Sequence, residues 1–321
     1  MRYGMTRPLL FLVLAITGLA AAPLAHAQDA QTYNLRPNWT PGQTARYEVW
    51  TNRTQHSVVT IAGKKNVDDL QMTSEGEVTW SVDQVKADGS ATCTMTLEWL
   101  SLDYIPGDGK TLKNDSRKGS GDIESFHALL KAMTGVPLKV SVAADGTITK
   151  VDGVRAIASR MKADLKEMVP EELDFIETAS DLATLIAAPE AADIGNKWDA
   201  NVKWTWSDRP FEGYLHHDMT FTLAGVEDLA GLPVAVVDGR SKLKLELDRS
   251  NLPEGMPPTD VKLIKGDLQT QIMFDLTRHE VVGRNTIQTS TIDFTIRLPS
   301  ATITRRLEET LQGQTLRIEE E

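Results

Sequence analysis

Cysteine is nearly absent from this chain, since Cys93 is the only one in 321 residues. A protein working in an oxidising compartment would therefore have no internal disulfide and would depend on its core for stability. Cys93 lies within residues 91–97, where apolar residues alternate with hydroxyl-bearing ones. We therefore expect Cys93 to point inward as a small hydrophobic side chain. No cysteine stands directly after the first apolar segment, so we also expect no acylation of the lipoprotein type.

Positive charge is also scarce, because 34 Lys and Arg residues face 45 Asp and Glu residues, giving a net charge of −11. Nucleic-acid-binding proteins gather basic residues on one face to displace counterions from phosphates. The local basic excess in this chain lies within a Gly-rich stretch, residues 109–121. That stretch is typical of a solvated loop, and we expect no nucleic-acid partner.

Long apolar runs are missing except near the start of the chain. The first 27 residues contain two arginines, an uncharged apolar run over residues 9–19 and an Ala-His-Ala sequence ending at Ala27. This arrangement predicts a signal peptide, 1–27, whose removal leaves Gln28 as the mature N-terminus. A retained membrane anchor is the alternative, but Gly18 and Pro23 interrupt the run, which is shorter than the roughly 20 residues that span a bilayer. We expect an exported protein, periplasmic or extracellular, without stable membrane insertion after processing.

What the chain does contain, over most of its length, is alternation of apolar and polar residues with a period of two. This pattern predicts strands of large antiparallel sheets, each sheet with one dry face. Asp88-Gly89 and Asp145-Gly146 predict tight hairpin turns, because Asp-Gly pairs accept the positive φ that such turns require. The alternating runs begin near residues 45, 78, 91, 138, 202, 219, 243, 272 and 292.

Three segments in the middle of the chain have helical spacing instead. They cover residues 122–135, 154–168 and 171–187, and each carries an apolar stripe with a polar back. Asp122 is the expected N-cap of the first. The sequence therefore predicts an α+β fold in which antiparallel sheets curl into one or two half-barrels, with the central helices covering their open faces.

Similar stretches in the two halves of the sequence predict the duplication of one strand-rich unit. The stretch before the strand at residues 45–49 is similar to the stretch before the strand at residues 202–206, with a glycine followed by an aromatic residue in each. We therefore divide the mature chain into an N-terminal half, 28–190, with strands then helices, and a C-terminal half, 191–321, with antiparallel strands.

Motifs that carry chemistry are incomplete in this sequence. Ser159 and Lys162 match the Ser-x-x-Lys pattern of serine enzymes that act on peptidoglycan, but the companion elements of that pattern are missing. His216 and Asp218 share one face of a strand, and two ligands are too few for a metal site. We expect no enzyme activity, no metal and no cofactor.

Aromatic and methionine residues form the set most informative for binding. Trp204 and Trp206 are two residues apart on one strand and should face the same side. One interpretation is that these large side chains fill the core, and the other is that they line an apolar ligand cavity. The candidate ligand-binding residues are Trp204, Trp206, Trp80, Trp99, Met95 and Met219.

Two stretches, residues 127–142 and 145–153, resemble the signature of an exported bacterial family of unknown function. A Gly-x-x-x-x-Tyr segment from Gly42 to Tyr47 and a later Trp-bearing strand ending near Trp204 are similar to the same family. The resemblance implies a fold and a compartment, and it implies no catalytic residue.

Three functions remain open from the sequence. The first is non-catalytic binding of an apolar ligand or lipid in a half-barrel cavity. The second is an envelope-associated interaction or structural module that binds another envelope protein by strand addition. The third is a hydrolase whose site is assembled from distant loops.

Overall fold

A computed structural model describes residues 31–168, 175, 178–179, 187–208, 211–229, 231–248 and 256–318, with backbone only at residues 164, 167–168 and 205–208. Residues Thr32–Glu321 form one compact unit. The signal peptide and the cleavage position between Ala27 and Gln28 lie outside the described residues, so both stay predictions.

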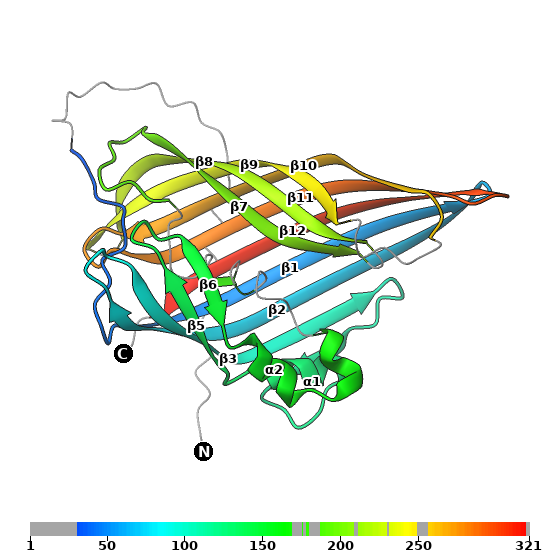
Figure 1. Cartoon of the computed structure of the whole chain (residues 1–321), viewed down its shortest axis with the longest axis horizontal. Helices are drawn as coiled ribbons and strands as arrows, with labels where there is room; N and C mark the ends of the chain where they lie inside the picture. The colour runs from blue at the N-terminus through cyan, green and yellow to red at the C-terminus, as the bar shows by residue number, and fades with distance from the viewer. Residues whose placement is uncertain are drawn as a thin grey trace, which may run out of the picture. The chain divides into compact units, whose positions relative to one another are not determined.

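A single antiparallel sheet of twelve strands makes up most of this unit (Figure 1). Its strand order is β6-β5-β3-β2-β1-β12-β11-β10-β9-β8-β7, with β4 paired to β3. The N-terminal half contributes β1 Thr44–Ile61, β2 Lys64–Val85, β3 Ala91–Pro106, β4 Leu112–Asp115, β5 Pro137–Val142 and β6 Ile148–Asp152. The C-terminal half contributes β7 Lys197–Asp208, β8 Phe211–Leu229, β9 Leu232–Asp248, β10 Thr259–Asp275, β11 Glu280–Arg297 and β12 Thr302–Ile318.

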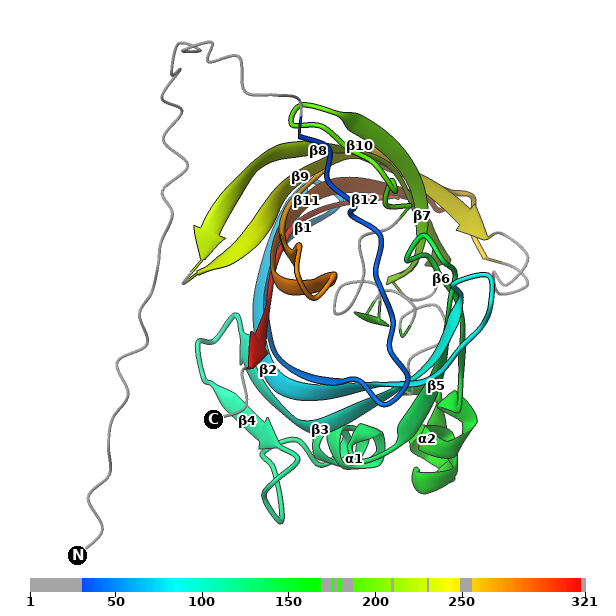
Figure 2. The ribbon, with the colours of Figure 1, turned by 90° about the vertical axis from the view of Figure 1, so that its left-hand side faces the viewer.

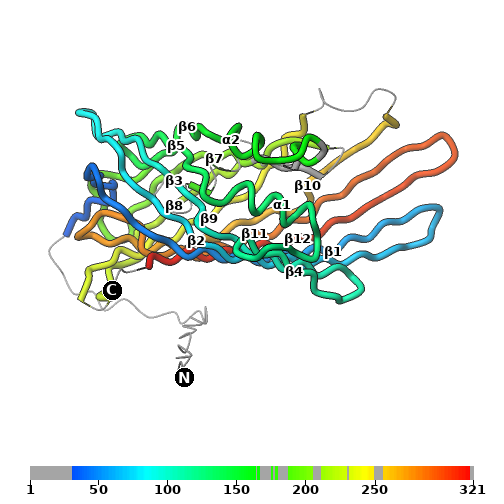
Figure 3. Tube along the Cα trace, turned by 90° about the horizontal axis from the view of Figure 1, so that it is seen from below, coloured from blue at the N-terminus to red at the C-terminus, as the bar shows by residue number. Residues whose placement is uncertain are grey.

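The two halves of the chain join through β1 and β12, which pair antiparallel from Arg46↔Ile318 to Ile61↔Ile303. The β1–β2 and β11–β12 hairpins therefore run side by side (Figure 3). The sheet curves strongly but does not close, because β6 and β7 stand at its two ends (Figure 2). The result is one curved sheet, and a duplication relating the two halves stays a prediction.

The expected Asp-Gly hairpin turns are confirmed. Gly89 and Gly146 have φ of +83° and +86°, in the left-handed region. Asp145 Oδ1 accepts a hydrogen bond from the Thr147 backbone N–H at 3.0 Å, and β5 pairs antiparallel with β6 on either side of this turn. The aspartate thus fixes the loop, and the glycine supplies the backbone conformation that other residues resist.

The two helices among the described residues are shorter than the sequence predicted. The first, α1 Glu124–Met133, has Ile123 at its N-cap without a side-chain hydrogen bond. Asp122, the expected cap, instead accepts a hydrogen bond from the Lys113 backbone N–H. The second, α2 Val154–Arg160, ends where Met161 becomes extended, and a 3₁₀ turn follows at Ala163–Met168.

The prediction of an α+β fold is therefore corrected to a mostly β fold, with two short α-helices among the described residues. Most of the third helical segment, 171–187, lies outside the described residues. Within the described part of the chain, α1 packs next to β3 and β4, and α2 packs on α1 (Figures 1 and 2). Periodicity identified the helical segments, but the hydrogen-bonded ladder of strands up to 22 residues long dominates the structure. Among the described residues, we find no helix with the length and apolar character needed to cross a bilayer.

The core lies on the concave side of the sheet, called the inner face here and defined by the buried residues Tyr47 and Phe221. One buried cluster includes Tyr47 and residues of β2, β3 and β5, and a second includes Phe221 and residues of β8 to β11. Cys93 belongs to the first cluster and is fully buried, as expected. Burial raises the pKa of its thiol to about 12.

Candidate functional site

A cavity of about 380 Å³ opens on the inner face of the sheet. Its described walls come from β1, β2, β3, β5, β7, β11 and β12, from the end of α1 and Val136 after it, and from Phe175 and Thr178. Protein interiors are normally packed with few voids larger than a water molecule, so an unfilled volume of this size is a feature to explain. The value lies within the roughly 300–1,000 Å³ that is typical of small-molecule pockets.

One wall of the cavity is apolar, and it is built by period-two alternation in neighbouring strands. Because alternate residues of a strand share a face, Met95 and Leu97 of β3 point the same way, next to Leu138 of β5. The apolar lining residues are Val49, Trp50, Val78, Met95, Leu97, Leu100, Met133, Val136, Leu138, Phe175, Trp204 and Leu311.

A β-bulge at Glu98 changes which side chains of β3 reach the cavity. Val78 pairs with Leu97 and Glu77 pairs with Trp99, so one extra residue of β3 is inserted at this point. Beyond the bulge, Leu100 lines the cavity. A Cβ at the paired Gly76 would lie 2.8 Å from the Trp99 carbonyl oxygen and 3.1 Å from Leu100, so glycine allows the close approach.

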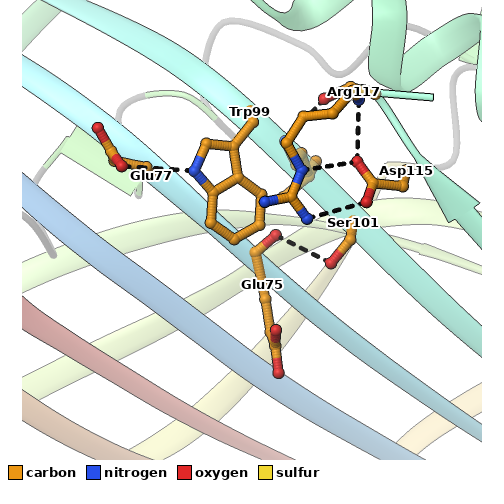
Figure 4. A network of polar contacts seen from close by, with 8 residues as sticks. Glu75, Glu77, Trp99, Ser101, Asp115 and Arg117 are labelled. Atoms are coloured by element: carbon orange, nitrogen blue, oxygen red, sulfur yellow. Dashed lines mark hydrogen bonds and ion pairs between the residues drawn. The ribbon is translucent and has the colours of Figure 1, made fainter. Parts of the chain in front are cut away.

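Trp99 consequently lies on the outer face, opposite the position that simple alternation predicts (Figure 4). The Arg117 guanidinium stacks over its ring, 3.9 Å from the centroid, and Arg117 pairs with both oxygens of Asp115. The indole N–H donates to Glu77 Oε2 at 3.4 Å. The pKa of Asp115 is lowered, chiefly by its hydrogen bonds from Arg117. The structure therefore places Trp99 in an outer polar network, away from the cavity.

The other candidates divide between the cavity and the core. Met95 and Trp204 line the main cavity, and Trp204 and Met219 also line an adjoining space of about 20 Å³. Trp80 is buried in the first core cluster, with its ring centroid 6.3 Å from that of Trp39. The side chain of Trp206 lies outside the described residues, so its predicted role stays a prediction.

His217 lies directly behind Trp204, and the sequence reasoning gave it no role at the cavity. The two ring centroids are 3.9 Å apart. His217 is fully buried, and neither ring nitrogen has a hydrogen-bond partner. Burial lowers the pKa of His217 to about 4. The imidazole is therefore neutral at physiological pH and forms part of the apolar support of Trp204.

His216 and Asp218 point outward and pair with the next strand. His216 Nε2 lies 2.5 Å from Glu246 Oε2, and Lys244 Nζ lies 2.5 Å from Asp218 Oδ2. The pKa of Asp218 is lowered by this lysine. Within the described residues no three His, Cys, Asp or Glu side chains gather in a way that could hold a metal ion.

A polar stripe on β11 forms the other wall, and the sequence reasoning did not identify it. Arg284, Thr286 and Gln288 are at alternate positions and all line the cavity. The sequence did contain a signal for this wall. The three polar residues have the same alternation along β11 as Ile292 and Phe294, whose side chains are buried on the inner face. A charged residue on the buried face of a strand is costly unless it is compensated.

The family model described as a family of unknown function, DUF6263, matches residues 88–278, which is more than half of the chain. The chain belongs to this family. The expected resemblance to a family of unknown function is thereby confirmed, and the match includes the helix and Asp-Gly hairpin that carried it. No curated protein sequence matches the chain significantly.

Solved structures with similar arrangements include lipovitellin, described in terms of lipid–protein interactions, at a TM-score of 0.40 and 9% identity. That match covers 85% of this chain and 25% of the lipovitellin chain, so this chain spans about a quarter of that protein's length.

Two further similar structures are bacterial. The outer membrane protein OprG from Pseudomonas aeruginosa has a TM-score of 0.24 and 5% identity, covering 87% of this chain and 99% of its own. A DUF1329 family protein from Desulfovibrio piger has a TM-score of 0.14 and 8% identity, covering 84% and 85%.

Proposed function

We propose that this DUF6263 protein binds an apolar ligand or lipid, without catalysis, in the inner-face cavity. The observation that carries the proposal is the unfilled volume of about 380 Å³ beside Met95, Leu97 and Trp204. The apolar wall of this space offers a surface against which an apolar molecule can pack. Binding would bury the exposed edges of these side chains and so stabilise the complex by the hydrophobic effect.

The lining combines shapes that suit a flexible ligand. Met95 and Met133 are unbranched and adaptable, whereas Trp204 supplies a rigid surface. The proposal includes the compartment predicted from residues 1–27, namely export to the periplasm or the extracellular space. A carrier there would shield a lipid chain from water between membranes or between proteins.

The second candidate function is an envelope-associated interaction module. It is favoured by the open ends of the sheet, because β6 and β7 are edge strands and an edge strand can accept a further strand from a partner. This candidate does not explain the unfilled cavity, so it ranks second.

The direct test is native mass spectrometry of the protein purified from its own envelope, where a bound small molecule supports ligand binding. A second test measures the affinity of N-phenyl-1-naphthylamine, a neutral apolar fluorophore. Val49→Phe places an aromatic ring into the cavity and should weaken fluorophore binding about tenfold, because overpacking of this kind costs about 1–3 kcal/mol.

The matched control is Leu316→Phe. Leu316 is 39% exposed and pairs with Glu48, on the strand that carries Val49, but its side chain is on the outer face. It receives the same aromatic ring without entering the cavity, so fluorophore affinity should be unchanged. Equal affinities for both variants and the unmodified protein, or no binding at all, would reject the cavity as the binding site.

A further inference from the structure

The cavity has one polar wall and one apolar wall. The polar wall lies on β11, which pairs with β10: Arg284 pairs with Ile272, Thr286 with Thr270 and Gln288 with Leu268. Ile272 and Leu268 are almost completely buried, so Arg284 and Gln288 project from β11 amid apolar neighbours. Sheet packing alone would be served better by apolar residues at these two positions.

Gln288 presents a polar atom that has no partner in the protein. Its side chain is only 5% exposed and lines the cavity, and its Oε1 atom makes no hydrogen bond. The indole N–H of Trp204, which lines the same cavity, is also without a partner. Buried polar groups are almost always satisfied in native proteins, so these two atoms need a third group. A ligand head that carries a hydrogen-bond donor would supply the partner that Gln288 Oε1 lacks.

Arg284 adds a positive charge at the same wall, and it is the one ionisable side chain among the described lining residues. It is 5% exposed and already has an interaction within the protein. A guanidinium has five N–H donors, so it can bind an anionic group in addition to that partner.

The spacing of these residues defines the size of the head. Arg284 and Gln288 are four residues apart on an extended strand, which places their Cα atoms roughly 13 Å apart. Both side chains are long, and Thr286 lies between them. A head with an anionic group at one end and a hydroxyl a few bonds away fits this spacing better than an isolated carboxylate.

Resting on the proposed function, we infer that the ligand is a single-chain amphiphile whose head carries an anionic group and a nearby hydroxyl. The anion binds Arg284, the hydroxyl donates to Gln288 Oε1, and the chain lies against the apolar wall of β3 and β5. Two sources share this chemistry: a monoacyl glycerol phosphate and a hydroxylated fatty acid. The volume of about 380 Å³ favours one chain, because it is near the lower limit for small-ligand pockets.

The experiment measures displacement of N-phenyl-1-naphthylamine by ligands with the same hexadecanoyl or hexadecyl chain, below their critical micelle concentrations. The ligands are 1-hexadecanoylglycerol 3-phosphate, 1-hexadecanoylglycerol, 2-hydroxyhexadecanoate, hexadecanoate and hexadecylamine. We expect the glycerol phosphate to bind on the order of tenfold more tightly than the neutral glycerol ester, as a charge-assisted hydrogen bond would give. Tighter binding of 2-hydroxyhexadecanoate than of both the glycerol phosphate and hexadecanoate would support the inference with the hydroxy acid as the source.

Variants of Gln288 and Arg284 then test whether these two residues cause the difference in affinity between the ligands. Gln288→Leu should reduce the advantage of 2-hydroxyhexadecanoate over hexadecanoate, and Arg284→Gln should reduce the advantage of the phosphate, with Arg284→Lys restoring part of it. Arg306→Gln is the control, because Arg306 pairs with Asp293 at 2.8 Å on the outer face. If an Arg284 variant does not fold, the series of ligands on the unmodified protein still decides.

Equal displacement by all five ligands, or the tightest binding by hexadecylamine, would overturn the inference while leaving apolar binding intact. Failure of the neutral fluorophore itself to bind would reject the proposed function instead, and with it the inference.

Discussion

Trp204 and His217 pack against each other on the inner face, with their ring planes tilted by 47° and their ring centroids 3.9 Å apart. They come from adjacent strands, where Val202 pairs with His217 and Trp204 pairs with Leu215, so the contact is diagonal across the β7–β8 pair. The indole faces the cavity, and the imidazole lies behind it with no hydrogen-bond partner. The cavity wall therefore depends on a histidine that has to stay neutral.

The first prediction concerns pH. The pKa of His217 is lowered to about 4 in the folded protein, from 6.5 in the unfolded chain, because burial disfavours the charged ring. Below pH 6.5 the unfolded chain binds a proton that the folded protein does not, so stability falls as pH decreases toward 4. The loss is about 3 kcal/mol in total, of which about 2 kcal/mol falls between pH 7 and pH 5. Urea unfolding at pH 7, 6 and 5 measures it.

The matched variants for this prediction are His217→Phe and His216→Gln. The first removes the buried titrating ring and should flatten the pH dependence between 7 and 5, whatever its effect on absolute stability. The second changes a histidine that points outward from the same strand and should keep most of the dependence. An unchanged slope in His217→Phe would contradict the assignment.

The second prediction separates two tryptophans by fluorescence. Trp204 and Trp50 line the cavity and Trp99 stacks under Arg117 on the outer face, so Trp204 should respond to a bound apolar ligand and Trp99 should not. A lipid analogue should shift the emission of the protein, and the shift should be reduced in Trp204→Phe and kept in full in Trp99→Phe. A shift that survives in Trp204→Phe and disappears in Trp99→Phe would place binding on the outer face.

The third prediction concerns the β5–β6 turn. Gly146 has φ of +86°, a conformation that costs a non-glycine residue about 1–2 kcal/mol. Gly146→Ala should therefore lower the free energy of unfolding by that amount in a urea titration. Gly225→Ala is the matched control, because no atom lies within 4 Å of its added Cβ. Its effect should be neutral or slightly stabilising, since alanine reduces the entropy of the unfolded chain. A larger loss for Gly225→Ala than for Gly146→Ala would disprove the turn assignment.

The fourth prediction concerns the buried ion pair between β11 and β12. Arg317 Nη1 lies 2.5 Å from Glu280 Oε1, and both side chains are largely buried. Burial raises the pKa of Glu280 despite the attraction of Arg317. Arg317→Met should destabilise the protein by about 3–5 kcal/mol, because it leaves a buried carboxyl group without this partner.

The double variant Arg317→Met, Glu280→Gln should recover part of that loss, because it removes the charge as well as its partner. Thermal unfolding of the single and double variants measures the difference. Additive losses in the double variant would mean that the two residues act independently.

Much of the fold follows from the sequence, because the relevant physics is local. Alternation at Met95 and Leu97, the Asp-Gly turns and the inward position of Cys93 were all predictable, since a strand turns alternate side chains to one face and glycine accepts positive φ. The helix at α1 was also predictable from its spacing, although its N-cap was not, because Asp122 bonds to Lys113 at the far end of a loop.

The positions of the candidate site residues could not all be predicted from local sequence. Alternation put Trp99 with Met95, but the bulge at Glu98 turned Trp99 to the outer face and brought Leu100 inward. A bulge of one residue cannot be recognised from the alternation within β3, because the bulge is defined by how β3 pairs with Glu77 and Val78 of β2.

The sequence by itself thus determined an antiparallel β protein with a predicted export signal, together with which side chains of most strands share a face. Only the tertiary structure decided that β1 pairs with β12, making one open sheet, and that Arg284 and Gln288 of β11 face Met95 of β3 across a cavity. Which side chains share a face is determined by the covalent geometry within each strand. Strand order and an unfilled interior depend on how strands distant in sequence pair and curve, and no local pattern encodes that.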